Sequence, residues 1–121
     1  MIISEKCFIF NYSKALELVE RLDYDFSTEK AITDYLLFAS AARAMQFDSK
    51  VKAYITEHPC ASVVNLGAGF ETEFYRIDNG TIRWYDLDLP ELIEVRKQLL
   101  PETDRSTCIA KSFLDLGWCT D

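Results

Sequence analysis

The hydrophobic and polar positions of this chain change their spacing near residue 59. In the first half, apolar residues recur every three or four positions, which is the spacing of an amphipathic helix. The pattern predicts helices over residues 13–22 and 28–47, and then a further helix that is capped by Asp48 or Ser49 and closed by Pro59. We therefore expect residues 1–58 to form a helical segment.

In the second half, short apolar runs alternate with turn residues. The runs predict strands over residues 63–66, 81–85 and 107–110, and a helix that begins at Pro90 and ends before Pro101. The turn Asp78-Asn79-Gly80 precedes the second strand. This order predicts the α/β class, as a partial doubly wound, Rossmann-like parallel sheet of about three strands.

Gly67 and Gly69 follow the first predicted strand directly. Glycine has no Cβ, so the backbone there can turn sharply and come close to a ligand. Asp86 and Asp88 end the second strand about 20 residues later, which is the spacing of a mononucleotide-binding βαβ unit. Parallel strands would bring both features to one edge, where Asp88, or failing that Asp86, could accept hydrogen bonds from ribose hydroxyls. For the glycines the alternative is a plain strand-to-helix turn. Asp88 could instead, or in addition, cap the helix at Pro90 or place a negative charge at its start.

Four other residues are expected to have structural roles. Arg76 is expected to form an ion pair with a helix neighbour. Trp84 and Trp118 are both expected to lie in the core or at an interface. On the helix after Pro90, Arg96 shares a face with apolar residues. It is expected to bury its stem and keep its charged head in water.

Composition narrows the class of protein. The 121 residues suffice for one small domain, and 49% of them are hydrophobic, as in globular chains. A net charge of −7 argues against a nucleic-acid partner, and no apolar run is long enough for a membrane span. The cysteines are too scattered for a metal site, and we expect them to be buried free thiols of a cytoplasmic protein. They are Cys7, Cys60, Cys108 and Cys119. The single histidine, His58, offers no catalytic set.

Residues 63–72 read Val-Val-Asn-Leu-Gly-Ala-Gly-Phe-Glu-Thr, and Phe-Tyr-Arg follows at residues 74–76. Residues 83–91 read Arg-Trp-Tyr-Asp-Leu-Asp-Leu-Pro-Glu, and residues 109–115 are followed by Trp118. Together with residues 24–26 and 42–48, these segments resemble the motifs of the leucine carboxyl methyltransferase family, which includes polyketide O-methyltransferases of the tetracenomycin type. The resemblance covers roughly residues 13–121. Two departures from the family pattern are Glu71, where the family mostly has Asp, and Ser112, which replaces an acid.

The resemblance implies an S-adenosylmethionine-dependent O-methyltransferase of the class I fold, acting on a hydroxyl or carboxyl group of a small molecule. Arg43 would hold the methionine carboxylate, Gly67 would lie under the methionine part, and Asp88 would bind the ribose. Ser112 and Phe113 would lie beside the adenine. The cofactor-binding residues implied are Arg43, Gly67, Ala68, Gly69, Asp88, Leu89, Ser112 and Phe113. No residue is assigned as catalytic, and no metal is implied.

The family's fourth and later strands have no counterpart here, so the resemblance implies a cofactor-binding half over residues 59–121. Three outcomes are open: a fragment of a larger enzyme, a homodimer along the exposed sheet edge, or an N-terminal segment folded over that edge. An alternative function is a non-catalytic nucleotide-binding or dimerisation module. An NAD-binding domain is disfavoured, because Thr72 stands where the dinucleotide fingerprint has a third small residue.

Overall fold

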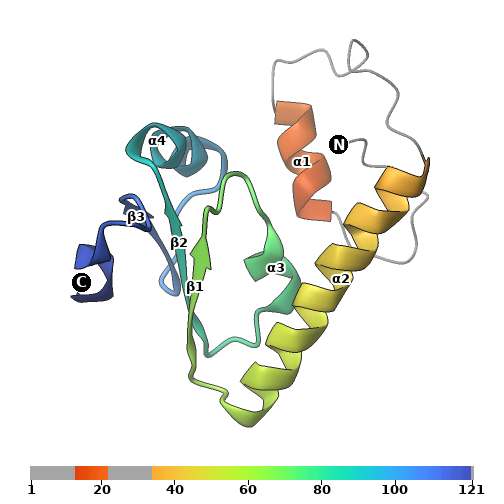
Figure 1. Ribbon diagram of the computed structural model, residues 1–121, viewed down its shortest axis with the longest axis horizontal. Helices are drawn as coiled ribbons and strands as arrows, with labels where there is room; N and C mark the ends of the chain where they lie inside the picture. Colours follow the sequence, from red (N-terminus) through yellow and green to blue (C-terminus); the bar gives the residue numbers. More distant parts are fainter. Residues whose placement is uncertain (1–12, 22–33, 121) are drawn as a thin grey trace.

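The computed structural model describes residues 13–21 and 34–120 (Figure 1). Two helices come first, and strands and helices then alternate. The elements are α1 (Ser13–Arg21), α2 (Asp34–Glu57), β1 (Ser62–Leu66), α3 (Glu73–Ile77), β2 (Arg83–Asp88), α4 (Pro90–Leu99), β3 (Ser106–Ala110) and the 3-10 helix η2 (Leu116–Thr120). The expected helix start near residue 28, residues 24–26 and Cys7 lie outside the described residues.

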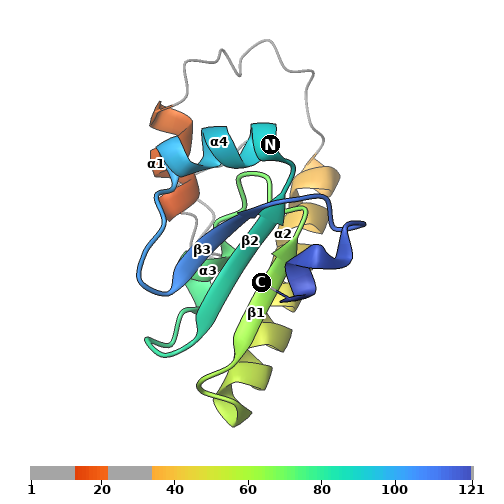
Figure 2. The ribbon, with the colours of Figure 1, turned by 90° about the vertical axis from the view of Figure 1, so that its left-hand side faces the viewer.

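The three strands form a parallel sheet in the order β1-β2-β3. In the register, Leu66 lies opposite Leu87, and Asp88 lies opposite Ala110, so all three strands end at the same edge. Figure 2 shows α4 lying across this carboxyl edge. The prediction of an α/β chain with a partial doubly wound sheet is confirmed.

The hydrophobic core lies between the sheet and helices α2 and α3, which cover the same side of it (Figure 1). Trp84 of β2 is 2% exposed and packs with Phe74 and Ile77 of α3 and Ile55 of α2. The core position expected for Trp84 is confirmed. Successive strand residues point to opposite faces. Because Val63 packs against this core, Val64 and Leu66 point to the other face.

Helix α1 is held against the C-terminal end of α4. The Arg21 guanidinium donates to the backbone carbonyls of Leu99, at 2.8 Å, and Gln98, at 3.0 Å. The last carbonyls of a helix have no partner within the helix and carry partial negative charge. Arg21 therefore satisfies the end of α4 and fixes α1 beside it.

The prediction of a helix break at residue 48 is wrong, because α2 runs without interruption from Asp34 to Glu57. Asp48 is a residue type that favours helix starts, and this suggested a cap. Instead its carboxylate is buried and accepts two hydrogen bonds from Arg76, at 2.7 and 3.1 Å. A side chain occupied in this way does not compete for the helix backbone.

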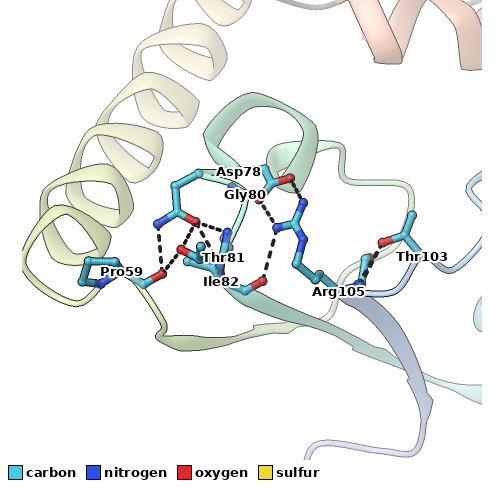
Figure 3. A network of polar contacts seen from close by, with 9 residues as sticks. Pro59, Asp78, Gly80, Thr81, Ile82, Thr103 and Arg105 are labelled. Atoms are coloured by element: carbon cyan, nitrogen blue, oxygen red, sulfur yellow. Dashed lines mark hydrogen bonds and ion pairs between the residues drawn. The ribbon is translucent and has the colours of Figure 1, made fainter.

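Strand β2 begins later than predicted, at Arg83 rather than near residue 81, because the preceding turn is longer (Figure 3). The Asn79 Oδ1 atom accepts hydrogen bonds from the backbone N–H groups of Thr81 and Ile82, both at 2.9 Å. The Thr81 hydroxyl donates to the Pro59 carbonyl. At the same edge, Arg105 pairs with Asp78, and its hydrogen bond holds the pKa of that carboxyl below its usual range.

The described cysteines, Cys60, Cys108 and Cys119, are all free thiols, as expected. The expectation that they are buried is wrong for Cys60 and Cys119, which are exposed. Cys60 lies in the turn before β1 and Cys119 on η2, so neither faces the core. Cys108 of β3 is half-buried, and burial raises the pKa of its thiol.

Candidate functional site

The glycine loop, residues 67–72, leaves the end of β1 and folds back onto the end of β2. Gly67 and Gly69 have φ angles of +67° and +49°, which are in the left-handed region that favours glycine. The N–H groups of Gly67 and Ala68 both donate to the Leu87 carbonyl, at 2.9 and 3.1 Å. The loop therefore lies at the carboxyl edge, with its backbone tied to the neighbouring strand.

Asp88, at the tip of β2, holds the glycine loop through its carboxylate. One oxygen accepts the Gly69 N–H at 2.8 Å, and the other accepts the N–H of Leu89 at 2.7 Å. The alternative reading of Asp88 as a side-chain cap is not supported, because α4 has Leu89 at its N-cap and no side-chain cap hydrogen bond. Asp88 is thus an acid directed at the loop.

The space above the two glycines is open. A Cβ atom built on Gly67 or Gly69 would meet no atom of the described chain within 4 Å. Ala68 between them is 3% exposed and points inward. At Gly67 and Gly69 the loop therefore presents bare backbone to the surroundings of the carboxyl edge.

Arg96 differs from its prediction, since its charged head is buried and not in water. Its side chain is 3% exposed, and it donates to Asp86 Oδ2 at 2.9 Å and to the Gly69 carbonyl at 3.0 Å. The spacing of apolar residues places Arg96 on an inward face of α4, but it does not reveal the carboxylate of Asp86 with which Arg96 forms an ion pair. Asp86 is 1% exposed and accepts hydrogen bonds from Arg96, Trp84 and Asn65, which leaves Asp88 as the accessible acid at the edge.

The far end of the glycine loop is tied to α2 and α3 through Arg76. Besides the pair with Asp48, its guanidinium contacts Glu71 Oε1 at 3.2 Å and Thr72 Oγ1 at 3.0 Å. The expected structural role of Arg76 in an ion pair is confirmed, with a partner on α2. These contacts anchor the segment that leads from the loop into α3.

The other residues expected at the cofactor site lie in two places. Leu89 and Phe113 are exposed, and Ser112, whose Oγ accepts the Leu114 N–H at 3.2 Å, is half-buried. They follow β2 and β3, so they share the carboxyl edge with the glycine loop. Arg43 is exposed on α2, and no described contact joins it to the loop.

Comparison with known proteins agrees with this arrangement. Residues 11–112 match the family model described as leucine carboxyl methyltransferase. The chain belongs to the leucine carboxyl methyltransferase family. It is 34% identical over 105 residues to the tetracenomycin polyketide synthesis O-methyltransferase TcmP of Streptomyces glaucescens. The match covers 86% of this chain but only 38% of that relative, and no solved structure matches.

Sequence reasoning missed one unusual carboxyl of this leucine carboxyl methyltransferase family member. Glu73 begins α3, and its pKa is raised to about 7 by burial and then by the negative charges of Asp48 and Glu71. Its Oε1 atom is buried and has no hydrogen-bond partner among the described residues. The sequence hint was weak: two glutamates, Glu71 and Glu73, with one residue between them.

The described residues contain neither a metal site nor a membrane-spanning helix. Within the described ranges, no group of three or more His, Cys, Asp or Glu side chains could hold a metal ion. No described helix is both long enough and apolar enough to cross a bilayer.

Proposed function

We propose that this chain binds S-adenosylmethionine at the carboxyl edge of its sheet and forms the cofactor-binding part of an O-methyltransferase. Family membership and the match to an O-methyltransferase support the reaction class. In this proposal residues 59–121 form the S-adenosylmethionine-binding half, and residues 1–58 form a helical segment of the same domain, from which Arg43 contributes one contact to the cofactor. The chain spans only 38% of the length of this relative. That the protein catalyses methyl transfer is therefore proposed here, and is not taken over from the relative.

The observation that carries the proposal is the open glycine loop fastened to an acid on the next strand. Gly67 and Gly69 leave space in which a ligand can reach the backbone. Asp88 is fixed by two backbone N–H groups, one to each oxygen. A carboxylate offers about four acceptor positions, so one on each oxygen remains for the two ribose hydroxyls.

The remaining assignments extend from the same edge. Leu89 would border the ribose, while Ser112 and Phe113, after β3, would lie beside the adenine. Arg43 would hold the methionine carboxylate, because a guanidinium matches a carboxylate in a two-pronged contact. When bound, the sulfonium cofactor supplies an activated methyl group, and the chain's residues bind and orient it.

The acceptor that we propose is a hydroxyl or carboxyl group of a small molecule. The printed name of the relative describes an O-methyltransferase of polyketide synthesis. A carboxylate acceptor is already ionised and needs no base, whereas a hydroxyl would benefit from one. We assign no catalytic residue in this chain. The free thiols of Cys60, Cys108 and Cys119 fit a reducing, cytoplasmic setting.

Calorimetric titration with S-adenosylhomocysteine, and separately with NAD, tests the proposal. We expect the first to bind and the second not to. Gly67→Ala should weaken binding by about tenfold or more, because the new methyl enters the space above the loop and the left-handed backbone is strained. No binding of S-adenosylhomocysteine, or preferred binding of NAD, would contradict the assignment.

The matched control is Gly80→Ala. Gly80 also has a left-handed φ, +87°, and open space around its Cβ position, but it lies in the turn at the opposite edge. Both substitutions should cost about 1–2 kcal/mol of stability from backbone strain. Only Gly67→Ala should change ligand binding. Equal effects of the two on affinity would mean that the glycine loop is not the site.

We also propose that two copies of the chain pair along β1. Among the described strands β1 pairs only with β2, so its outer edge has no strand beside it. Val64 and Leu66 are 38% and 51% exposed on this strand. An unprotected, apolar edge strand is a template for another strand.

A further inference from the structure

We propose that Arg96 is a positioning residue, which fixes the glycine loop in the shape that receives the cofactor. This inference rests on the proposed function. It assigns to the buried pair Arg96–Asp86 a task beyond stability: holding the peptide group of Gly69 in place from beneath.

Gly69 is gripped on both sides of its Cα atom. Its carbonyl oxygen accepts a hydrogen bond from Arg96 at 3.0 Å, and its N–H donates to Asp88 Oδ2 at 2.8 Å. The first partner comes from α4 and the second from the tip of β2. Glycine is the residue with the greatest backbone freedom, and φ is +49° here. Two fixed partners therefore select one conformation from many.

The Arg96 guanidinium is itself immobilised. Its second terminal nitrogen donates to Asp86 Oδ2 at 2.9 Å. The other oxygen of Asp86 accepts from the Trp84 indole at 2.9 Å and from the Asn65 amide at 3.1 Å. Trp84 belongs to the hydrophobic core, and Asn65 lies on β1. A chain of hydrogen bonds through Arg96 and Asp86 thus connects the Gly69 carbonyl to the sheet and fixes its position.

Stability alone is a poor explanation for this pair. Removing two charges from water costs several kcal/mol per ion, and apolar groups of similar volume often replace such pairs without loss. Arg96 also leaves its Nε atom buried and without a partner among the described residues. A hydrophobic side chain could fill the same space, but it could not donate to the Gly69 carbonyl. The contact to the loop is what the arginine adds.

The consequence for binding is a population effect. When only a fraction of molecules has the competent loop, the apparent dissociation constant rises in inverse proportion to that fraction. Without the Arg96 contact, we expect the loop to be competent in about a tenth of the molecules, since a charge-assisted hydrogen bond is lost. Arg96 would then affect affinity without touching the ligand.

The test uses the double variant Asp86→Asn/Arg96→Met. Both charges are removed together, so no unpaired charge stays buried, and the amide that replaces the Asp86 carboxylate still offers an oxygen to Trp84. Two quantities are measured: amide hydrogen exchange of residues 66–72 without ligand, and the dissociation constant for S-adenosylhomocysteine. We expect exchange in the loop to be about tenfold faster and binding about tenfold weaker.

The matched control is Asp78→Asn/Arg105→Met. It removes another arginine–aspartate pair, at the opposite edge of the sheet (Figure 3). Neither loop exchange nor affinity should change in this variant. Unchanged loop exchange and affinity in the Asp86→Asn/Arg96→Met chain, or the same changes in both double variants, would overturn the positioning role.

Arg96→Lys provides a second variant should the double variant fail to fold. A lysine can keep the ion pair with Asp86, but its single ammonium lacks the fork that reaches Asp86 and Gly69 together. We expect a cooperative thermal transition with faster loop exchange, and wild-type exchange would refute the inference. If the unaltered chain does not bind S-adenosylhomocysteine, the proposed function fails and with it the effect on affinity. Exchange without ligand still decides whether Arg96 holds the loop.

Discussion

At the residue scale, Glu73 occupies the environment least suited to its charge. Its neighbours Asp48 and Glu71 are both acidic, while the nearby Arg76 already gives two hydrogen bonds to Asp48 and one to Glu71. A proton on Glu73 removes the repulsion and provides a hydrogen bond to Asp48. The carboxyl is therefore half protonated near neutral pH, and its ionisation works against folding.

This predicts a pH-dependent gain in stability for Glu73→Gln. The pKa is 4.5 when unfolded and about 7 when folded, so the folded chain binds the extra proton between these values. Stability of the wild type falls as pH rises through this window, and the full penalty is present above pH 7. At pH 8 we expect Glu73→Gln to be more stable by roughly 1–2 kcal/mol, a reduced figure because the side chain is partly exposed.

Urea unfolding at pH 5 and pH 8 measures the effect. The advantage of Glu73→Gln should shrink at pH 5, where the native glutamate holds its proton. Glu94→Gln, at an exposed position on α4, is the control and should change stability little at either pH. A gain of the same size at both pH values would show that the carboxyl does not titrate as described.

Asp88 gives the second prediction at this scale. Asp88→Ala removes the carboxylate oxygens that accept the N–H groups of Gly69 and Leu89, as well as the proposed ribose contacts. Binding of S-adenosylhomocysteine should weaken roughly 10- to 100-fold, the value of a charge-assisted hydrogen bond. Asp88→Asn keeps one acceptor oxygen, so its affinity should lie between those of the wild type and Asp88→Ala. Calorimetric affinities in the order wild type, Asn, Ala would agree, and an unaffected Asp88→Ala chain would exclude the ribose role.

At the element scale, the pair Asp48–Arg76 joins α2 to α3. Both side chains are nearly buried, with 7% and 8% exposed, and the contact is two-pronged. Arg76→Met leaves the Asp48 carboxylate buried beside Glu73, and it should lower the free energy of unfolding by about 3–5 kcal/mol. Asp48→Asn/Arg76→Met removes both charges and should recover most of the loss. Denaturant unfolding of the two variants gives the comparison, and equal losses would contradict this account.

The sequence predicted elements well where turn residues and periodicity agree. Pro90 opens α4, the glycines follow β1, and the predicted strand bounds differ from the observed ones by at most three residues. It failed where a tertiary partner decides. By its residue type Asp48 resembles a helix cap, but its carboxylate binds Arg76. By its spacing Arg96 resembles a cation with a solvent-exposed head, but it binds Asp86 and Gly69. A local sequence pattern gives no information about a contact partner that lies far away along the chain.

The same limit applies to the candidate site. The loop Gly67–Gly69 and Asp88 could be found by spacing, because a βαβ unit fixes the distance along the chain between strand ends. The hydrogen bond from the Gly69 N–H to the Asp88 carboxylate agrees with that inference. The Arg96 contact and the raised pKa of Glu73 depend on packing between α2, α3 and α4. Neither residue stands in a recognisable motif.

At the scale of the whole molecule, the sheet is covered unequally. Helices α2 and α3 lie on one face, whereas η2 lies on the other (Figures 1 and 2). The second face carries the exposed Val64 and Leu66, and the segment leading into η2 exposes further apolar side chains. These are Phe113, Leu114 and Leu116. Apolar surface beside an unpaired strand edge favours association with a second chain.

The proposed homodimer follows from symmetry. A two-fold axis beside β1 would place it antiparallel to its own copy, and the two sheets would become one. Sedimentation at increasing concentrations should then show a monomer–dimer equilibrium. Leu66→Lys puts a charge on the edge strand and should shift the chain to monomer, because edge lysines oppose strand pairing. Val95→Lys, at an exposed apolar position on α4, is the matched control and should still dimerise. A wild type that sediments as a monomer at every concentration would exclude pairing through β1.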